Sequence, residues 1–280
     1  MEWPWKISKE QEIKPPNCSN LLPKISIITP SFNQGKFIEE TIRSVLLQNY
    51  PNLEYILIDG GSTDDTLEIV DKYKRWISYF QTGPDSGQAD AIARGFEKAT
   101  GEILAWINSD DRYQPNALLR VAKFFDEYND CVFGNGDVNY IDEGGRLISR
   151  IYAIKPNPFI TSNIGVHGWP QPGCFWRKST YEMVGGIDRN LQFCMDRDLF
   201  IRLAHAGKAK RIPGGPLADF RIHGNAKTSR WKSVAQVENK LLINRYGSKY
   251  CQVMPGVVRL LWFAWTVPRR FDALYDKIRA

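Results

Sequence analysis

Short apolar runs alternate with amphipathic segments along the first 125 residues of this chain. The apolar runs have the length of strands and occur at 24–29, 54–59, 77–82 and 103–109. Between the first two runs, apolar residues recur at helical spacing from Phe37 to Leu46. Strands and helices that alternate four times in this way form a doubly wound, mostly parallel sheet with right-handed crossovers. The pattern therefore predicts an α/β fold.

The pattern after residue 125 is less regular and predicts a smaller second region. It indicates strands at 131–141, 146–153, 173–177 and 217–222, a proline-bearing loop at 155–172, and helices at 196–206 and 232–246. We divide the chain into an N-terminal arm at 1–23, a main domain at 24–229 with halves at 24–125 and 126–229, and a C-terminal helical tail at 230–280.

Polar residues follow the predicted strands of the first half, at the sheet edge where such folds bind ligands. They are Asn33, Asp59, Asp64, Asp90, Asp110 and Asp111. The last two are adjacent carboxylates, which repel each other unless a positive charge compensates them. A divalent cation held by one or two carboxylates and substrate phosphates is the usual compensator, whereas a solvated turn is the alternative for the pair alone.

Motifs and cysteines exclude several other classes of protein. No G-x-G-x-x-G follows the first strand and no P-loop motif occurs, which disfavours a dinucleotide site and a P-loop nucleotide site. The five cysteines are odd in number and form no C-x-x-C pair, so we expect a reducing compartment and neither disulfides nor zinc. The first 20 residues are polar and do not read as a signal peptide, which favours a cytoplasmic location.

Seven motifs in order give the chain a resemblance to glycosyltransferase family 2. They are TPSFN at 29–33, IDGGSTD at 58–64, GQADA at 87–91, NSDD at 108–111, GGID at 185–188, MDRD at 195–198 and RIH at 221–223. The resemblance implies a GT-A type, Rossmann-like sheet with an acceptor-side region, a nucleotide-sugar donor, a divalent metal and an inverting transfer. In these terms 24–125 is the nucleotide-binding half and 126–229 the acceptor-binding half.

The resemblance also implies roles on the donor side. Pro30 and Asn33 would line the nucleotide pocket, and Asp64 would belong to the same donor site. Asp59 would accept a hydrogen bond from the base, most simply from a uracil N–H. Asp90 would lie near the ribose or the sugar.

Further roles concern the metal and the transfer step. Asp111 would ligate Mn²⁺ or Mg²⁺ through a DXD-like motif, with His223 as a second metal-side ligand, and Asp110 would support the ribose or donor sugar. Asp196 aligns with the catalytic base, and Asp198 is the fallback. A positioned base is worth roughly 10²–10⁴-fold in rate because the acceptor hydroxyl is a poor nucleophile until it loses its proton.

Several of these residues also have plain structural interpretations. Met195 stands where many relatives have Glu, which leaves the role of that acid vacant. Asp196 could be an ordinary helix cap, and His223 could be a histidine satisfied within the core or at the surface. Trp169 and Gln171 in the proline-bearing loop would either contact sugar on the acceptor side or pack.

These observations favour a hexosyltransferase that moves a sugar from a UDP-sugar to a hydroxyl group of a glycan or lipid-linked acceptor in cell-surface polysaccharide synthesis. A non-catalytic nucleotide-sugar binding module is the alternative, and a nucleotidyltransferase on a similar sheet is a weaker one. No motif for nucleic-acid recognition is present. The sequence does not indicate an oligomeric state.

The C-terminal part of the chain is strongly basic. The net charge is +6, yet residues 201–280 alone hold 16 Lys and Arg against 4 Asp and Glu. The apolar run at 257–267 would span about 16 Å as a helix, against roughly 30 Å for a bilayer core. We therefore expect 257–280 to lie at an anionic inner-membrane surface as a peripheral element, or to pack on protein.

Overall fold

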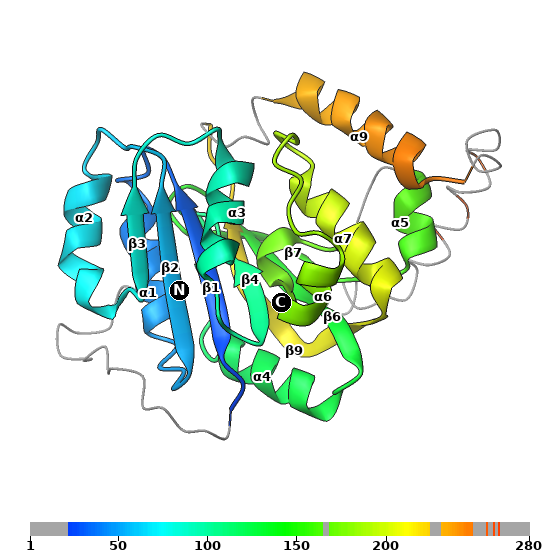
Figure 1. Ribbon diagram of the computed structural model, residues 1–280, viewed down its shortest axis with the longest axis horizontal. Helices are drawn as coiled ribbons and strands as arrows, with labels where there is room; N and C mark the ends of the chain where they lie inside the picture. The colour runs from blue at the N-terminus through cyan, green and yellow to red at the C-terminus, as the bar shows by residue number, and fades with distance from the viewer. Residues whose placement is uncertain are drawn as a thin grey trace.

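The computed structural model of this 280-residue chain describes residues 22–164, 168–224 and 231–248, together with single positions at 256, 260 and 263. Most of the predicted arm at 1–23, and of the apolar and basic segment at 257–280, lies outside these residues. Figure 1 shows one continuous sheet with helices packed along both of its faces.

The first half forms the parallel part of the sheet. Its strands are β1 (Ile25–Ser31), β2 (Leu53–Asp59), β3 (Tyr79–Thr82) and β4 (Ile103–Trp106), which lie in the order β3-β2-β1-β4. Its helices are α1 (Ile38–Leu46), α2 (Thr66–Tyr73), α3 (Gln88–Lys98) and α4 (Ala117–Glu127), with a short 3₁₀ helix η1 (Lys74–Trp76) after α2. Strand and helix alternate as the sequence pattern predicts.

The second half extends the same sheet from β4. Its strands are β5 (Arg112–Tyr113), β6 (Cys131–Ile141), β7 (Leu147–Ile151), β8 (Cys174–Arg177) and β9 (Lys208–Arg221). The order continues β4-β8-β6-β9-β5, with β8 antiparallel to both neighbours and β7 paired to β6. Its helices are α5 (Pro158–Ile164), η2 (Gln171–Gly173), α6 (Lys178–Met183), α7 (Met195–Ala206) and α9 (Lys232–Tyr246).

Two apolar cores lie on opposite faces of the sheet. Ile25 and Ile27 of β1 belong to the core that contains α1, α2 and α4. Ile28 belongs to the other core, which contains α3 and α7. Because successive strand residues point to opposite faces, an uninterrupted apolar strand can supply both cores. This explains why the central strands read as continuous apolar runs.

Three features of the second half differ from the sequence prediction. Helix α5 lies within the predicted loop at 155–172, and helix α6 follows β8 without having been predicted. Strand β9 begins at Lys208, nine residues before the predicted start at 217. Its middle contains two prolines and two glycines with positive φ, which interrupt the alternation that would have revealed it.

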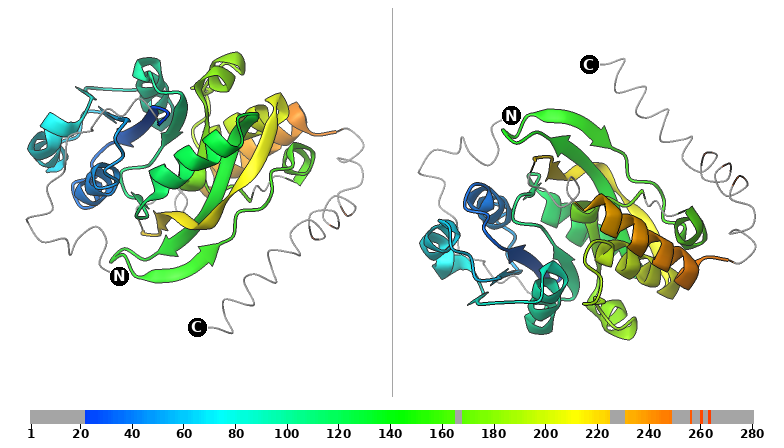
Figure 2. Two further views of the ribbon diagram at one scale, coloured as in Figure 1. Left: turned by 90° about the horizontal axis from the view of Figure 1, so that it is seen from below. Right: turned by 90° about the horizontal axis from the view of Figure 1, so that it is seen from above.

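Helix α9 packs on the main domain. It contacts α5, and its Leu242 is fully buried in the core that contains α3 and α7. Figure 2 shows α9 lying alongside α7, so the helix at 232–246 shares the core of the residues before it. Within the described part of the chain, every helix is too short or too polar to span a membrane.

Candidate active site

A cavity of about 600 Å³ opens at the carboxyl ends of β1, β2 and β4. Register places these ends together, because Ser31 pairs with Asp59 and Ile28 pairs with Trp106. The end of β1 and the residue after it contribute Pro30, Ser31 and Phe32 to its wall. The loop after β4 contributes Asn108, Ser109 and Asp110, and the start of α7 contributes Met195 and Asp196. The strand-end polar segments predicted from the sequence therefore meet at one site.

Asp110 lines this cavity and pairs with His223, which is buried and is not among the residues that line it. The imidazole Nε2 of His223 lies 2.9 Å from the Asp110 carboxylate Oδ2, and the His223 ring packs against Phe37 with centroids 4.8 Å apart. The Asp110 side chain is 19% exposed and lines the cavity. Its carboxylate is therefore open to a ligand.

Asp111, in contrast, points into the protein. Its side chain is fully buried, with Oδ1 accepting the backbone N–H of Arg221 at 2.9 Å and Oδ2 accepting from the Asn108 amide at 3.2 Å. Burial raises the pKa of the Asp111 carboxyl well above its usual range, and the negative charge of Asp110 raises it further. Sequence reasoning paired Asp111 with His223, whereas the structure pairs His223 with Asp110. The two adjacent acids differ because one faces the cavity and the other holds the turn.

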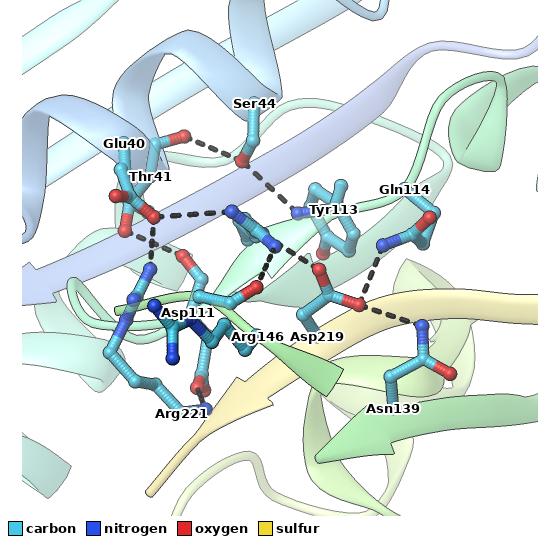
Figure 3. A network of polar contacts seen from close by, with 12 residues as sticks. Glu40, Thr41, Ser44, Asp111, Tyr113, Gln114, Asn139, Arg146, Asp219 and Arg221 are labelled. Carbon is cyan, nitrogen blue, oxygen red and sulfur yellow. Dashed lines mark hydrogen bonds and ion pairs between the residues drawn. The ribbon is translucent and has the colours of Figure 1, made fainter. Parts of the chain in front are cut away.

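A buried polar network fixes this turn against β9 (Figure 3). Arg221 donates from Nε to the Asp110 carbonyl at 2.9 Å and forms an ion pair with Glu40. Arg112 also contacts Glu40, and its Nε donates to Asp219 at 2.7 Å. Strand β9 is thus tied to the turn after β4 immediately before the chain reaches His223. Sequence reasoning missed this network, since residues 112 and 219 are far apart in the chain.

Three predicted donor-side residues hold the loops together. Asp59 is fully buried and accepts from the Gly61 and Ser62 N–H groups at 2.9 and 2.8 Å and from the Thr82 hydroxyl at 2.8 Å. The Asn33 side chain accepts the Thr63 N–H at 2.9 Å, and Asp64 accepts the Gly35 N–H at 2.9 Å. None of Asn33, Asp59 and Asp64 is among the residues that line the cavity.

Asp90, predicted to lie near the ribose or the sugar, is not among the residues that line the cavity, whereas Asp85 of the same loop is. Asp90 is buried and ion-paired with Arg94 at 2.7 Å and Arg189 at 2.9 Å, away from the cavity wall. Asp85 lines the cavity, with Oδ1 accepting the Gly87 N–H at 2.8 Å. Its Oδ2 lies 2.8 Å from the point where a Cβ at Gly60 would be, so the absence of a side chain at 60 makes room for this carboxylate. The polar loop at 83–90 was recognised as a site segment, but Asp85 was not singled out.

The two candidate bases have opposite surroundings. Asp196 lines the cavity and accepts the Arg197 N–H through Oδ1 at 2.7 Å. Asp198 is fully buried, with Oδ2 paired to Arg202 at 2.5 Å and Oδ1 accepting from Arg245 at 3.0 Å and the Tyr246 hydroxyl at 2.7 Å. Only Asp196 of the two faces the cavity.

The two predicted acceptor-side residues also separate. Gln171 lines the cavity, where it donates to the Trp106 carbonyl at 2.8 Å and accepts from the Asn108 amide at 3.2 Å. Trp169 is fully buried and packs edge-on against Phe133 with centroids 5.6 Å apart. Of the two interpretations of Trp169, the structure therefore supports packing and not a sugar contact. Trp231 and Phe193 are aromatic cavity residues that sequence reasoning missed.

Comparisons with known proteins agree on one family. The model of glycosyl transferase family 2 matches residues 26–181. An uncharacterized glycosyltransferase of Mycobacterium tuberculosis is 29% identical over 188 residues, which cover 65% of this chain and 69% of that protein. TuaG of Bacillus subtilis, a putative teichuronic acid biosynthesis glycosyltransferase, is 28% identical over 220 residues, covering 77% of this chain and 86% of that protein.

A crystal structure of S. aureus TarS residues 1–349 in complex with UDP-GlcNAc superimposes with a TM-score of 0.62 at 19% identity. The match covers 74% of this chain and 61% of the TarS fragment, so this chain spans less than two thirds of that structure. At this identity the likeness concerns the fold.

Proposed function

This chain belongs to glycosyl transferase family 2, and from that premise we propose that it moves a hexose from a UDP-sugar to a hydroxyl group of a glycan or lipid-linked acceptor. The observation that carries the proposal is the arrangement of the cavity. Asp110, which is paired with His223, and Asp196 both line the cavity and supply the two kinds of group that glycosyl transfer requires. One kind stabilises a leaving diphosphate, and the other accepts a proton.

Asp110 and His223 are suited to a divalent cation that the substrate helps to bind. The Asp110 carboxylate lines the cavity and lies 2.9 Å from the imidazole nitrogen of the buried His223, and no group of three acidic, histidine or cysteine ligands occurs among the described residues. Mg²⁺ and Mn²⁺ sites of this type use one or two protein ligands and complete the shell with substrate phosphates and water. Bound there, Mn²⁺ or Mg²⁺ would neutralise charge on the departing diphosphate. We assign the metal side to Asp110 and His223, with Asp111 supporting the turn.

Asp196 is our proposed general base. As the acceptor oxygen attacks the anomeric carbon, the Asp196 carboxylate takes the hydroxyl proton while the bond from that carbon to the diphosphate oxygen breaks. Attack from the face opposite the diphosphate inverts the anomeric configuration. The opening of Asp196 to the cavity supports this role, and the saturation of Asp198 by Arg202, Arg245 and Tyr246 argues against the fallback.

Donor recognition is proposed for the wall formed by Pro30, Gly60 and Asp85. A carboxylate that lines a largely apolar cavity can accept the N–H of a uracil ring, and a buried polar contact of this kind discriminates strongly between bases. The described geometry gives this opportunity to Asp85, since Asp59 is occupied by its own loop. TarS has been crystallised with UDP and with UDP-GlcNAc, which supports a UDP-sugar here.

The acceptor is proposed to belong to cell-surface polysaccharide synthesis, and the similarity to TuaG, named as a putative teichuronic acid biosynthesis glycosyltransferase, supports this proposal. We retain the tail as a peripheral attachment of a cytoplasmic enzyme to the inner membrane face. Leu260 and Phe263, three positions apart in the sequence, are 71% and 50% exposed. Apolar and basic residues combined in one segment are typical of an element that lies at a membrane surface.

A thermal-shift screen of UDP-, GDP- and dTDP-sugars with Mn²⁺ tests the donor assignment. A ligand at 100 times its dissociation constant stabilises a protein by about 2.7 kcal/mol, which is a readable shift. Asp85→Asn should remove most of the preference for UDP, while Asp126→Asn, an exposed change on α4, should leave it intact. An unchanged preference in folded Asp85→Asn would refute the base contact. Binding of UDP-sugars without any UDP release would instead favour the non-catalytic module.

A further inference from the structure

Helix α9 reaches across to the segment that leads into α7. Its Glu238 is only 8% exposed, although it is a charged residue outside the residues 26–181 that match the family model. Glu238 Oε1 accepts the Gln192 N–H at 2.7 Å, and Oε2 accepts the N–H groups of Phe193 and Cys194 at 2.9 and 2.7 Å. These three residues lead directly into α7, which begins at Met195.

The physical reason for this contact is the start of α7. The first backbone N–H groups of a helix have no partner inside the helix and carry partial positive charge. The N-cap residue of α7 is Cys194, which forms no side-chain cap. A carboxylate from another helix therefore satisfies the N–H groups just before α7 and favours the helix dipole.

Two further contacts tie α9 to the residues that flank Asp196. Asn239 accepts from the Arg197 guanidinium at 2.5 Å, and Asp198 accepts from Arg245 at 3.0 Å. Positions 192–194, 197 and 198 are thus anchored to α9, while Asp196 between them faces the cavity. Helix α9 therefore holds the backbone before the proposed base and two side chains after it.

We propose that Glu238 is a positioning residue for glycosyl transfer, which fixes the backbone at 192–194 so that the Asp196 carboxylate stays directed into the cavity. This inference rests on the proposed role of Asp196 as the base. Replacement of Glu238 by glutamine leaves one acceptor oxygen and an amide donor against three backbone N–H groups next to the base, so at least one of these groups loses its partner, whereas the Asp110–His223 pair is untouched. Turnover should fall while donor affinity is kept, because small misplacement of a catalytic group costs rate more than binding.

The test compares Glu238→Gln with Leu242→Ala in the full chain. Leu242 lies one turn further along α9 and is fully buried in the apolar core, so its truncation weakens the packing of α9 but leaves the three hydrogen bonds from positions 192–194 to Glu238 in place. Hydrogen exchange is followed for the 192–194 amides, and UDP release from UDP-GlcNAc with water as acceptor gives kcat and KM. Glu238→Gln should speed exchange of these amides and lower kcat at least ~10-fold, with the donor KM within about twofold of wild type. Leu242→Ala should lower the melting temperature, but at temperatures where this variant is folded its kcat should stay near that of wild type.

Wild-type kcat in folded Glu238→Gln would overturn the inference, and so would equal losses of kcat in the two variants. If Glu238→Gln does not fold, Glu238→Asp replaces it, because this change keeps the charge but shortens the reach. Slower turnover with faster exchange at 192–194 then supports the inference, and wild-type turnover overturns it. Asp196→Asn is measured in parallel. Wild-type turnover in Asp196→Asn would show that the base assignment itself is wrong, which separates that failure from a failure of Glu238 alone.

Discussion

Asp196 and Asp198 lie two positions apart, and the structure predicts that their replacement by asparagine will have opposite consequences. Asp196→Asn should leave stability nearly unchanged, because an asparagine oxygen can still accept the Arg197 N–H. It should lower turnover by at least ~10²-fold, the low end for a general base, while donor affinity is kept. Asp198→Asn should lower stability and leave turnover in the folded protein nearly intact.

The size of the stability loss follows from the partners of Asp198. Breaking a buried ion pair costs about 3–5 kcal/mol when the remaining charge stays buried. Here Arg202 and Arg245 are 19% and 40% exposed at the side chain, so water can solvate part of their charge. We therefore expect a loss of about 2–3 kcal/mol. At roughly 2–4 °C per kcal/mol for a chain of this size, the melting temperature should fall by about 4–12 °C.

Thermal unfolding and UDP release on the same preparations measure both effects. The expected outcome is a stable but inactive Asp196→Asn and a destabilised but active Asp198→Asn. The reasoning is refuted if Asp198→Asn is the inactive variant at a temperature where it is folded, while Asp196→Asn turns over normally. That result would make Asp198 the base, and the Asp198 carboxylate would then have to face the cavity in the active enzyme.

Three further outcomes are expected. Asp110→Asn should abolish the Mn²⁺-dependent part of UDP binding measured by calorimetry, and Asp111→Asn should mainly lower the melting temperature; the reverse result would restore the assignment made from sequence. Burial alone would raise the pKa of the Glu54 carboxyl. Hydrogen bonds from Lys24, Ser26 and Thr100 outweigh this effect, and the pKa of Glu54 falls to about 2. Because the folded-state pKa is depressed, the stabilisation by the Glu54 carboxylate is complete above about pH 4.5 and is lost as the pH falls toward 2. Urea unfolding should therefore show Glu54→Gln to be about 2 kcal/mol less stable than wild type at pH 6 and closer to wild type at pH 3. Parallel curves of stability against pH for the two proteins would contradict this. The full chain should float with phosphatidylglycerol vesicles at low salt, and a chain ending at Gly247 should not, although it keeps α9; an unbound full chain would exclude the membrane attachment.

The family and the GT-A fold could be predicted from the sequence, and both are confirmed. Alternating apolar runs and helical segments fix a parallel sheet because each strand must bury both faces. The same logic predicts that the polar residues after these strands share one edge of the sheet, and of the six residues it named only Asp110 lines the cavity. These predictions depend only on local pattern and chain direction.

Which of two neighbouring acids faces the cavity could not be predicted. The inward turn of Asp111 depends on the N–H of Arg221, which arrives with β9 about a hundred residues later. In the same way, the burial of Trp169 depends on Phe133, and the role of α9 depends on Glu238 meeting backbone groups 44 to 46 positions earlier. Contacts between a side chain and distant backbone leave no periodic signal in the sequence.

The order of strands in the sheet also has a consequence for biosynthesis. β4 ends at Trp106 and its antiparallel neighbour β8 begins at Cys174, so at about 5–20 residues per second the ribosome needs about 4–14 s to supply the missing strand. During that interval β4 is paired with β1 on one side only. Its N–H and C=O groups on the other side have no strand partner, and α7 does not yet cover its apolar face. Chaperone binding to the emerging chain should therefore be concentrated in this window. Synonymous codon changes that slow translation between 107 and 173 should increase aggregation without altering the finished enzyme.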